Sequence, residues 1–111
     1  MCIFCKIVAG EISSTKVYED EEVLGFEDLN PAAPRHLLFI PKRHVENFVE
    51  ASLHPGLIES VFQGIGNYCR EHGLENEGLR VVSNSGASAG QSVFHLHFHV
   101  LGGRRLTWPP S

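Results

Sequence analysis

Three histidines at two-residue spacing, His95, His97 and His99, stand in the stretch SVFHLHFHVLGG. Successive side chains of a β-strand point to opposite faces, so these imidazoles would share one face at intervals of about 7 Å. A helix would scatter them around its circumference. The spacing predicts a strand whose histidine face could serve catalysis, bind a metal or do neither. The opposite, buried face would carry Phe94, Leu96, Phe98 and Val100.

A polar loop over residues 84–92 comes directly before the histidines and contains Gly86 and Gly90. Glycines let backbone N–H groups approach a phosphate closely, although a plain hairpin loop has the same composition. With a phosphate in this loop, a neutral imidazole could attack phosphorus, and water could then open the phosphohistidine. The attacking ring needs one nitrogen held as a donor. His97, with a histidine on each side, is the best placed nucleophile.

Length and composition limit the class of protein. With 111 residues, 42% hydrophobic and 20% charged, the chain suits one globular domain. A net charge of −4 argues against broad binding of nucleic acid, but it allows one small phosphate ligand. We see no apolar run near the roughly 20 residues of a membrane helix. We also see no secretory leader. A cytoplasmic protein without membrane or nucleic-acid partners is the expectation.

The three cysteines are Cys2, Cys5 and Cys69. Their odd number, without a leader, argues against a disulfide framework. Cys2 and Cys5 form a C-x-x-C motif, which could be a redox pair, half of a zinc site or a coincidence. Cys69 falls on a predicted helix, where a buried thiol acts as an apolar filler.

The elements that would position these residues indicate an α+β domain. Short connections predict about five strands in a mainly antiparallel sheet, with a short N-terminal helix and one main helix between the third and fourth strands. Apolar residues recur three and four apart over 57–72, and Gly73 ends that helix. The predicted strands cover 15–20, 22–30, 35–41, 78–85 and the histidine segment, with an irregular helix within 44–56.

Several blocks together resemble the histidine triad (HIT) superfamily over essentially the whole chain. They are CIFCKIVAGEI, FEDLNPAAPRHLLFIPKRH, NSGASAGQSV, QSVFHLHFHVLGGR and the terminal WPPS. LGGR and WPP make the chain most similar to the Hint branch, the histidine triad nucleotide-binding proteins. The resemblance implies a single HIT domain over 1–111 and a HIT-like fold. It also implies a homodimer, with residues 57–72 supplying much of the interface.

The same resemblance implies catalytic roles. His97 matches the family's nucleophile, which forms a nucleotidyl-histidine intermediate, and His99 matches the histidine that contacts the α-phosphate. His95 supports the nucleophile from behind, and His36 completes an inner hydrogen-bond relay. Ser92 is placed to help protonate a leaving amine.

Further positions match the family's nucleotide contacts. Asp28 matches the acceptor for the ribose hydroxyls. Apolar walls for the base are implied at Phe4, Ile7, Phe26 and Leu29, which without the resemblance would be assigned to the core. Asn84, Gly90, Ser92 and His99 match residues around the phosphate and leaving group.

The implied reaction is hydrolysis of a purine nucleoside 5′-phosphoramidate, such as an AMP–amine conjugate, to AMP and amine, with no cofactor needed for the chemistry. Dinucleoside polyphosphate hydrolysis is the second enzyme hypothesis. A nucleotide-binding module acting through protein partners is the third. A metalloenzyme with His-x-His ligands is a fourth, and it predicts loss of activity on chelation. The sequence leaves open the amine and the choice between adenine and guanine.

Some relatives carry a structural zinc at positions that match Cys2, Cys5, His44 and His95 here. Two cysteines and two histidines form a closed tetrahedral ligand set, which is typical of structural rather than catalytic zinc. The alternative is a pair of free thiols. Bound zinc would tie the N-terminus to the histidine strand without touching the phosphate.

Overall fold

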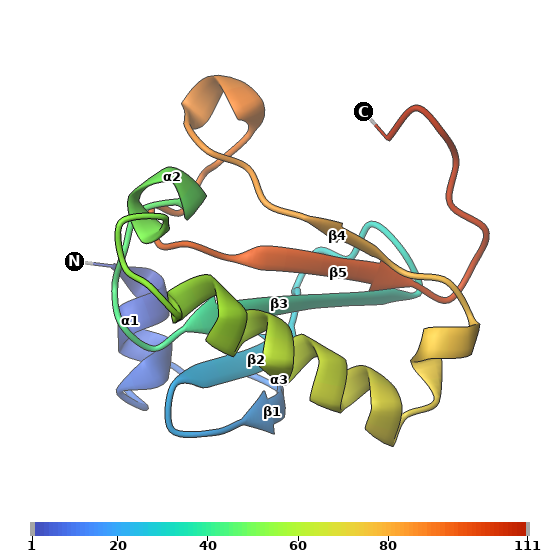
Figure 1. Cartoon of the computed structure of the whole chain (residues 1–111), viewed down its shortest axis with the longest axis horizontal. Coiled ribbons are helices and arrows are strands. Elements are labelled where there is room, and N and C mark those ends of the chain that lie inside the picture. Colours follow the sequence, from blue (N-terminus) through green and yellow to red (C-terminus); the bar gives the residue numbers. More distant parts are fainter. Residues whose placement is uncertain (1, 111) are drawn as a thin grey trace.

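Five short segments of the chain form one five-stranded sheet (Figure 1). The computed structural model describes residues 2–110. Each neighbouring pair of strands is antiparallel, in the order β1-β2-β3-β5-β4. The predicted fold class is confirmed, and both ends of the predicted domain, residues 1 and 111, lie outside the described residues. The strands are β1 (Lys16–Glu19), β2 (Val23–Glu27), β3 (Arg35–Pro41), β4 (Arg80–Val82) and β5 (Phe98–Gly102).

The main helix, α3 (Leu57–Glu71), lies where the apolar spacing predicts it. It ends one residue early, with His72 as C-cap and Gly73 in the left-handed conformation at φ 66°. Glycine adopts that conformation without strain, which explains why the helix stops there. The irregular segment before it holds the short α2 (Phe48–Ala51). The face of α3 toward the sheet buries Leu57, Val61, Ile65, Tyr68 and Cys69.

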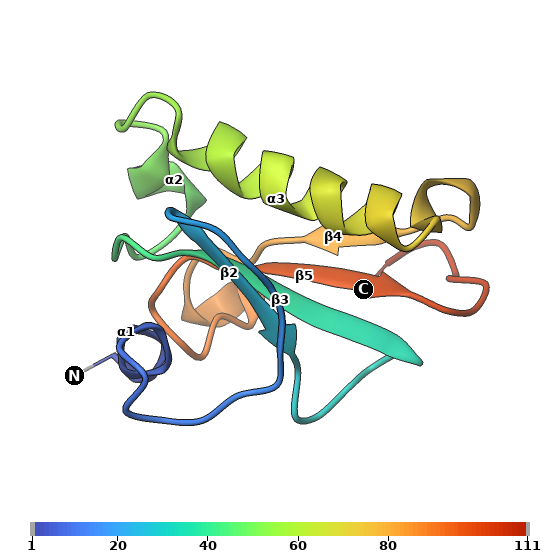
Figure 2. The same ribbon diagram turned by 90° about the horizontal axis from the view of Figure 1, so that it is seen from below.

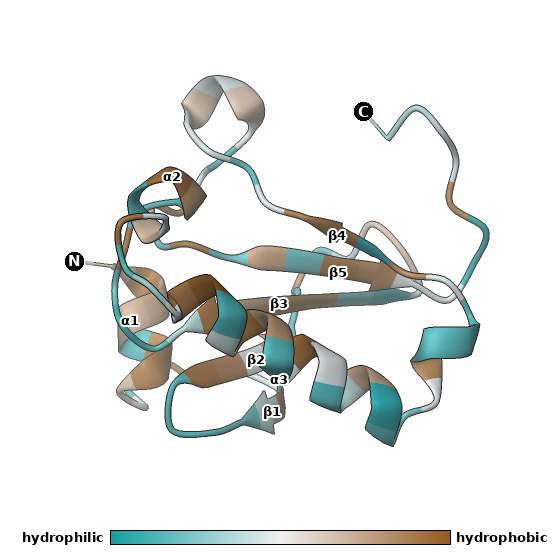
Figure 3. Ribbon diagram, in the orientation of Figure 1, coloured by the Kyte–Doolittle hydropathy of each residue, from teal (hydrophilic) through white to brown (hydrophobic). Residues whose placement is uncertain are grey.

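Two apolar clusters lie on opposite faces of the sheet, because residues of β3 alternate between them. Leu37 and Phe39 face α3, whereas Leu38 and Ile40 pack under α1 (Ile3–Val8). Figure 2 shows α3 and α1 on the two sides of the sheet, and Figure 3 shows the hydrophobic ribbon of β2 and β3 between them. His36 shares the α1 side by the same alternation. The functional face of the sheet is therefore the one opposite the main helix.

The prediction of one continuous strand through all three histidines is wrong. Only His99 lies on β5, while His95 and His97 precede it in irregular backbone. The ladder with β3 ends at the Phe39–Phe98 pair, and the Leu96 N–H donates to the Val45 carbonyl at 2.7 Å instead. The backbone thus turns away from the sheet. Phe94, predicted to be buried, is 47% exposed as a result.

The remaining differences are short helices that the sequence pattern does not reveal. A 3-10 turn, η1 (Leu74–Asn76), follows α3, and another, η2 (Ala87–Ala89), lies inside the predicted polar loop. Strand β4 is shorter than the predicted 78–85. Of the helices in residues 2–110, none has the length and apolar character needed to cross a membrane.

Candidate functional site

His97, the predicted nucleophile, is buried, and one ring nitrogen is held by the backbone. Its Nδ1 lies 2.8 Å from the carbonyl oxygen of His95. A carbonyl only accepts, so Nδ1 carries the proton, and the neutral ring keeps its lone pair on Nε2. None of the residues from 2 to 110 forms a hydrogen bond with that Nε2. The ring is therefore oriented and its reactive nitrogen is left uncommitted.

Ser83, which directly follows β4, holds the backbone at His97, and α1 packs against the His97 ring. The Ser83 hydroxyl donates to the His97 carbonyl at 2.9 Å. The ring of Phe4 meets the His97 ring edge-on at a centroid distance of 5.2 Å. Phe4 also packs on Phe26 at 5.5 Å. The N-terminal helix is thus part of the wall of the site.

His36 and His99 form a relay on the other side of the nucleophile. The Ala32 N–H donates to His36 Nδ1 at 2.9 Å, so His36 carries its proton on Nε2. That Nε2–H faces His99 Nδ1 at 2.8 Å and lies 3.4 Å from a carboxylate oxygen of Asp28. His99 accepts at Nδ1 and, as a neutral ring, offers Nε2–H as a donor. The predicted relay residue thus meets His99 rather than His97.

His99 stays uncharged in this position. Burial lowers the pKa of His99 from 6.5 to about 4, and the neighbouring rings of His97 and His36 add to the effect. The Asp28 carboxylate opposes that shift only as the smallest contribution. At neutral pH His99 is therefore a neutral hydrogen-bond donor, suited to a phosphoryl oxygen.

Asp28 lies where the relay reaches the surface. One carboxylate oxygen accepts the Asn30 N–H at 2.7 Å, and the other faces His36. A cavity of about 310 Å³ opens beside Asp28 and His36. The neighbouring Leu29 is 90% exposed, so it contributes nothing to the core and is free to contact a ligand. Phe4, Ile7 and Phe26 are instead buried in the core cluster under α1.

The polar loop is tied down by a glutamine that the sequence pattern did not single out. Gln91 is buried, its side-chain oxygen accepts the Gly86 N–H at 2.8 Å, and its amide donates to the Glu46 carbonyl at 2.6 Å. The loop therefore has a fixed shape and is not a plain flexible connection. Gly90 is exposed at φ 96°, Asn84 is half-buried and Ser92 is exposed. The signal available in the sequence was a glutamine directly after Gly90 in the polar loop.

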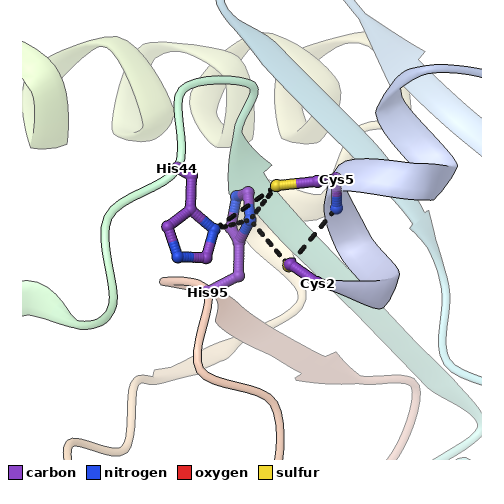
Figure 4. A group of neighbouring side chains, drawn as sticks. All are labelled: Cys2, Cys5, His44 and His95. Atoms are coloured by element: carbon purple, nitrogen blue, oxygen red, sulfur yellow. Dashed lines mark hydrogen bonds between the residues drawn. The ribbon is translucent and has the colours of Figure 1, made fainter.

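Cys2, Cys5, His44 and His95 converge at one end of the sheet (Figure 4). The cysteines come from the start of α1, where Cys2 is the N-cap and accepts the Cys5 N–H at 3.3 Å. His44 comes from the chain after β3. His95, fully buried, has its Nε2 at 2.7 Å from the Pro41 carbonyl. That carbonyl fixes the proton on Nε2 and turns the Nδ1 lone pair toward the cysteines.

The spacing of these four ligand atoms fits a tetrahedral zinc ion. His95 Nδ1 lies 3.4 Å from Cys2 Sγ, 3.6 Å from Cys5 Sγ and 3.2 Å from His44 Nδ1. With zinc–ligand bonds of about 2.0 to 2.3 Å, tetrahedral ligand atoms lie about 3.3 to 3.8 Å apart. Burial lowers the pKa of His95, which keeps its ring neutral as a metal ligand must be. The residues present fit a structural zinc.

One family model and several known proteins match this chain. The family model described as HIT domain matches residues 9–106, which leaves the two N-terminal cysteines outside the match. A "14 kDa zinc-binding protein" of Zea mays is 45% identical over 98% of this chain and 87% of its own length. The "Protein hit" of Bacillus subtilis is 46% identical over 90% of this chain and 69% of its own.

Solved structures superpose closely on this chain. A HIT family hydrolase from Legionella pneumophila has a TM-score of 0.94 and 41% identity, with all of both chains covered. A histidine triad protein from Clostridium difficile has a TM-score of 0.91 and 45% identity, over 96% of this chain and 93% of that one. The fold is therefore shared with proteins of known structure.

Proposed function

This chain belongs to the HIT domain family, and we propose that it is a nucleotide hydrolase that cleaves the P–N bond of purine nucleoside 5′-phosphoramidates. Support for a hydrolase comes from the similar Legionella and Clostridium thermocellum proteins, both described as HIT family hydrolases. Support for the reaction comes from the arrangement of His97, His99 and the relay behind them. The similarity to the Hint branch, the homodimer, the single domain over 1–111 and the cytoplasmic location stay predictions.

The single observation that carries the proposal is the hydrogen bond from His97 Nδ1 to the His95 carbonyl, at 2.8 Å. It leaves Nε2 as the nucleophilic atom of a neutral imidazole. Attack by Nε2 on the α-phosphorus forms a P–N bond to His97 and breaks the P–N bond to the amine. Water then attacks the same phosphorus and releases AMP, and His97 returns to its neutral form.

The groups around His97 have distinct parts in this reaction. The Nε2–H of His99 donates to a phosphoryl oxygen and stabilises the charge that develops there. Ser92, exposed at the end of the fixed loop, supplies a hydroxyl for the proton that the leaving amine takes up. The loop that carries Asn84 and Gly90 contacts the phosphate through N–H groups other than that of Gly90, which donates to the Ala87 carbonyl at 3.0 Å. Charge on the phosphoryl group is thus met by oriented dipoles rather than by a bound cation.

The nucleoside would lie between the relay and α1. Asp28 accepts hydrogen bonds from the ribose hydroxyls beside the 310 Å³ cavity. The base lies against the edges of Phe4, Ile7 and Phe26, and exposed Leu29 covers its other side. Burial of Leu29 by the base is the expected consequence. The three buried residues therefore serve both as core and as the floor of the base site.

We infer that Cys2, Cys5, His44 and His95 hold a structural zinc. The metal would supply a cross-link between α1, the segment after β3 and the chain before β5. The chemistry on phosphorus needs no cofactor under this proposal. His95 Nδ1 faces Cys2 and the His95 carbonyl accepts from His97, so the metal site and the nucleophile would use different atoms of His95.

The test is a steady-state assay of wild type and His97→Ala on a fluorogenic adenosine phosphoramidate, with zinc content measured on the same samples. We expect turnover in wild type, none in the variant, and equal zinc in both. Wild-type protein that binds AMP but turns nothing over would overturn the proposal in favour of a binding module. Turnover of dinucleoside polyphosphates alone would favour the second enzyme hypothesis. Loss of turnover on chelation without loss of folded structure would favour a catalytic metal.

A further inference from the structure

Metal ligands and active-site wall alternate along the first turns of α1. Cys2 and Cys5 face the metal cluster, while Phe4 between them touches the rings of both His95 and His97, at 5.9 and 5.2 Å. The helix has only six residues, Ile3–Val8. A helix this short is not stable by itself and depends on its tertiary contacts. Whatever holds the two sulfurs therefore acts together with the core cluster under α1 to hold Phe4 against the nucleophile.

His95 is the second link between the cluster and the nucleophile. Its Nδ1 faces the cysteines, its Nε2 is fixed by Pro41, and its carbonyl oxygen accepts from His97 Nδ1. The backbone here is not part of a ladder, because β5 begins only at Phe98. The position of the His95 carbonyl consequently depends on two anchors, the bond from the Leu96 N–H to the Val45 carbonyl at 2.7 Å and the side chain of His95. Loosening the cluster would disturb the hydrogen bond that orients His97.

We propose that Cys2 and Cys5 form an oxidation-sensitive latch, in which disulfide formation releases the zinc and detaches α1 from the active site. The inference rests on the zinc centre and the hydrolase activity proposed above. It adds a modification site, the C-x-x-C pair, and a class of reactant, a peroxide. The reduced, metal-bound form is the active one.

The oxidation balances with hydrogen peroxide as the oxidant. One thiolate attacks a peroxide oxygen and becomes a sulfenic acid, with hydroxide leaving. The second thiolate attacks that sulfur and displaces a second hydroxide, which forms the S–S bond. In sum, two thiolates and one peroxide take up two protons and give one disulfide and two waters. The disulfide sulfurs carry no charge, so the zinc loses two of its four ligands and leaves as Zn²⁺.

Position and exposure favour this pair over the third cysteine. The two sulfurs lie within 4.8 Å of each other in one helical turn, so a small rotation of the side chains joins them. Both residues are half-buried, and a cavity of about 410 Å³ lined by Cys2, His44 and Ser92 opens beside them. Cys69 is buried against the sheet under α3. A small oxidant therefore reaches the pair first.

The experiment treats zinc-loaded protein with increasing hydrogen peroxide in the Cys69→Ala background, in which Cys2 and Cys5 are the only thiols. Three quantities are followed: zinc released to a chromogenic chelator, free thiols with the mass of the chain, and AMP affinity with turnover. We expect one zinc released per two thiols lost, a mass decrease of 2 Da, and a fall in turnover and AMP affinity of about tenfold or more. Dithiothreitol with added zinc should restore all of them.

Two results would overturn the latch. One is loss of thiols and zinc with turnover and AMP affinity unchanged, which would make the pair a structural clip without control over the site. The other is retention of zinc at peroxide levels that oxidise a thiol elsewhere. The Cys2→Ser, Cys5→Ser double variant, in which Cys69 is the remaining thiol, gives the peroxide level at which a thiol outside the pair is oxidised. Zinc release with oxidation to sulfinic acid in place of a disulfide would contradict reversibility and thus the switch.

The variant His97→Ala separates this proposal from the proposed function. It lacks the nucleophile, so its zinc release, thiol loss and weakened AMP binding on oxidation should match those of wild type. If unoxidised wild type shows no phosphoramidate turnover while AMP binding still falls with the thiols, the hydrolase proposal fails and the latch stands. If turnover is present and insensitive to oxidation, the hydrolase stands and the latch fails.

Discussion

Two groups of polar side chains flank His97. Each contains one histidine whose proton is held on a particular ring nitrogen by a backbone group. We call Asp28, His36 and His99 the relay corner, and Cys2, Cys5, His44 and His95 the metal corner. The Ala32 N–H donates to His36 Nδ1 in the first, and the Pro41 carbonyl accepts from His95 Nε2 in the second. The backbone partner is thus a donor in one corner and an acceptor in the other. This difference in polarity gives the same type of side chain opposite tasks.

In the relay corner, the proton on His36 Nε2 makes His36 a hydrogen-bond donor toward His99. His36 offers Nε2–H to His99 Nδ1 at 2.8 Å, and His99 then offers its own Nε2–H to a ligand. In the metal corner, the proton on His95 Nε2 leaves the lone pair on Nδ1, and this nitrogen faces the sulfurs of Cys2 and Cys5. A histidine's chemistry here is therefore decided by the backbone group that it contacts, more than by its place in the His-x-His-x-His motif.

The largest effect on turnover is expected at His97, which lies between the two corners and belongs to neither. Replacement with alanine removes the only atom proposed to bond to phosphorus, and we expect turnover to fall by about a thousandfold or more. Turnover is measured with the phosphoramidate assay, and metal analysis of the same samples should show the zinc content of wild type. Residual turnover within about tenfold of wild type would mean that another residue is the nucleophile.

Removing a ligand from the metal corner should lower zinc affinity and thermal stability more than it lowers the rate of the reaction. Cys5→Ser removes one of four ligands, and we expect zinc affinity to fall by about a hundredfold or more, with a lower Tm that extra zinc partly restores. Competition with a chelator of known affinity measures the first quantity and a thermal melt measures the second. Cys69→Ala is the matched control and should bind zinc as wild type does. Equal affinity in Cys5→Ser would place the metal elsewhere.

Much of this architecture follows from local sequence pattern, and the exceptions have physical causes. The apolar spacing over 57–72 and the near-continuous apolar run in 35–41 predict α3 and β3 to within a residue. The pattern of alternating histidines over-extends β5, because periodicity does not reveal that the ladder with β3 stops at the Phe39–Phe98 pair and that the Leu96 N–H donates to the Val45 carbonyl instead. The family resemblance identifies the seven histidines and cysteines of the two corners and the nucleophile. It does not show that His36 meets His99, or that Gln91 holds the loop, since both depend on long-range contacts.

Breaking the relay corner should lower the rate without touching the metal. His36→Ala leaves the Ala32 N–H without its acceptor and His99 Nδ1 without its donor. His99 can then adopt either tautomer, and we expect kcat to fall by about ten- to a hundredfold. Zinc content should be unchanged, because no ligand of the metal corner contacts His36 among the described residues. His36→Asn tests geometry: its amide can replace one of the two hydrogen bonds, so kcat should lie between the two proteins.

The smallest effect is the pH dependence that His99 gives to stability. Its pKa is lowered to about 4 in the folded protein, against 6.5 for an ordinary histidine. Between those values the unfolded chain binds a proton that the folded chain does not, so the free energy of unfolding decreases as pH falls from about 6.5 toward 4. Above about pH 7 neither state is protonated there, and this contribution is constant.

The tautomer argument can be measured directly through that titration. Nitrogen chemical shifts of His99 should show a neutral ring with the proton on Nε2 down to about pH 5, and a midpoint near pH 4. In urea unfolding at saturating zinc, His99→Asn should lose less stability than wild type between pH 7 and 5, because the buried imidazole is gone. A midpoint near 6.5 would show that the relay corner is open to solvent. The polarity difference between the two corners would then exist only at the metal.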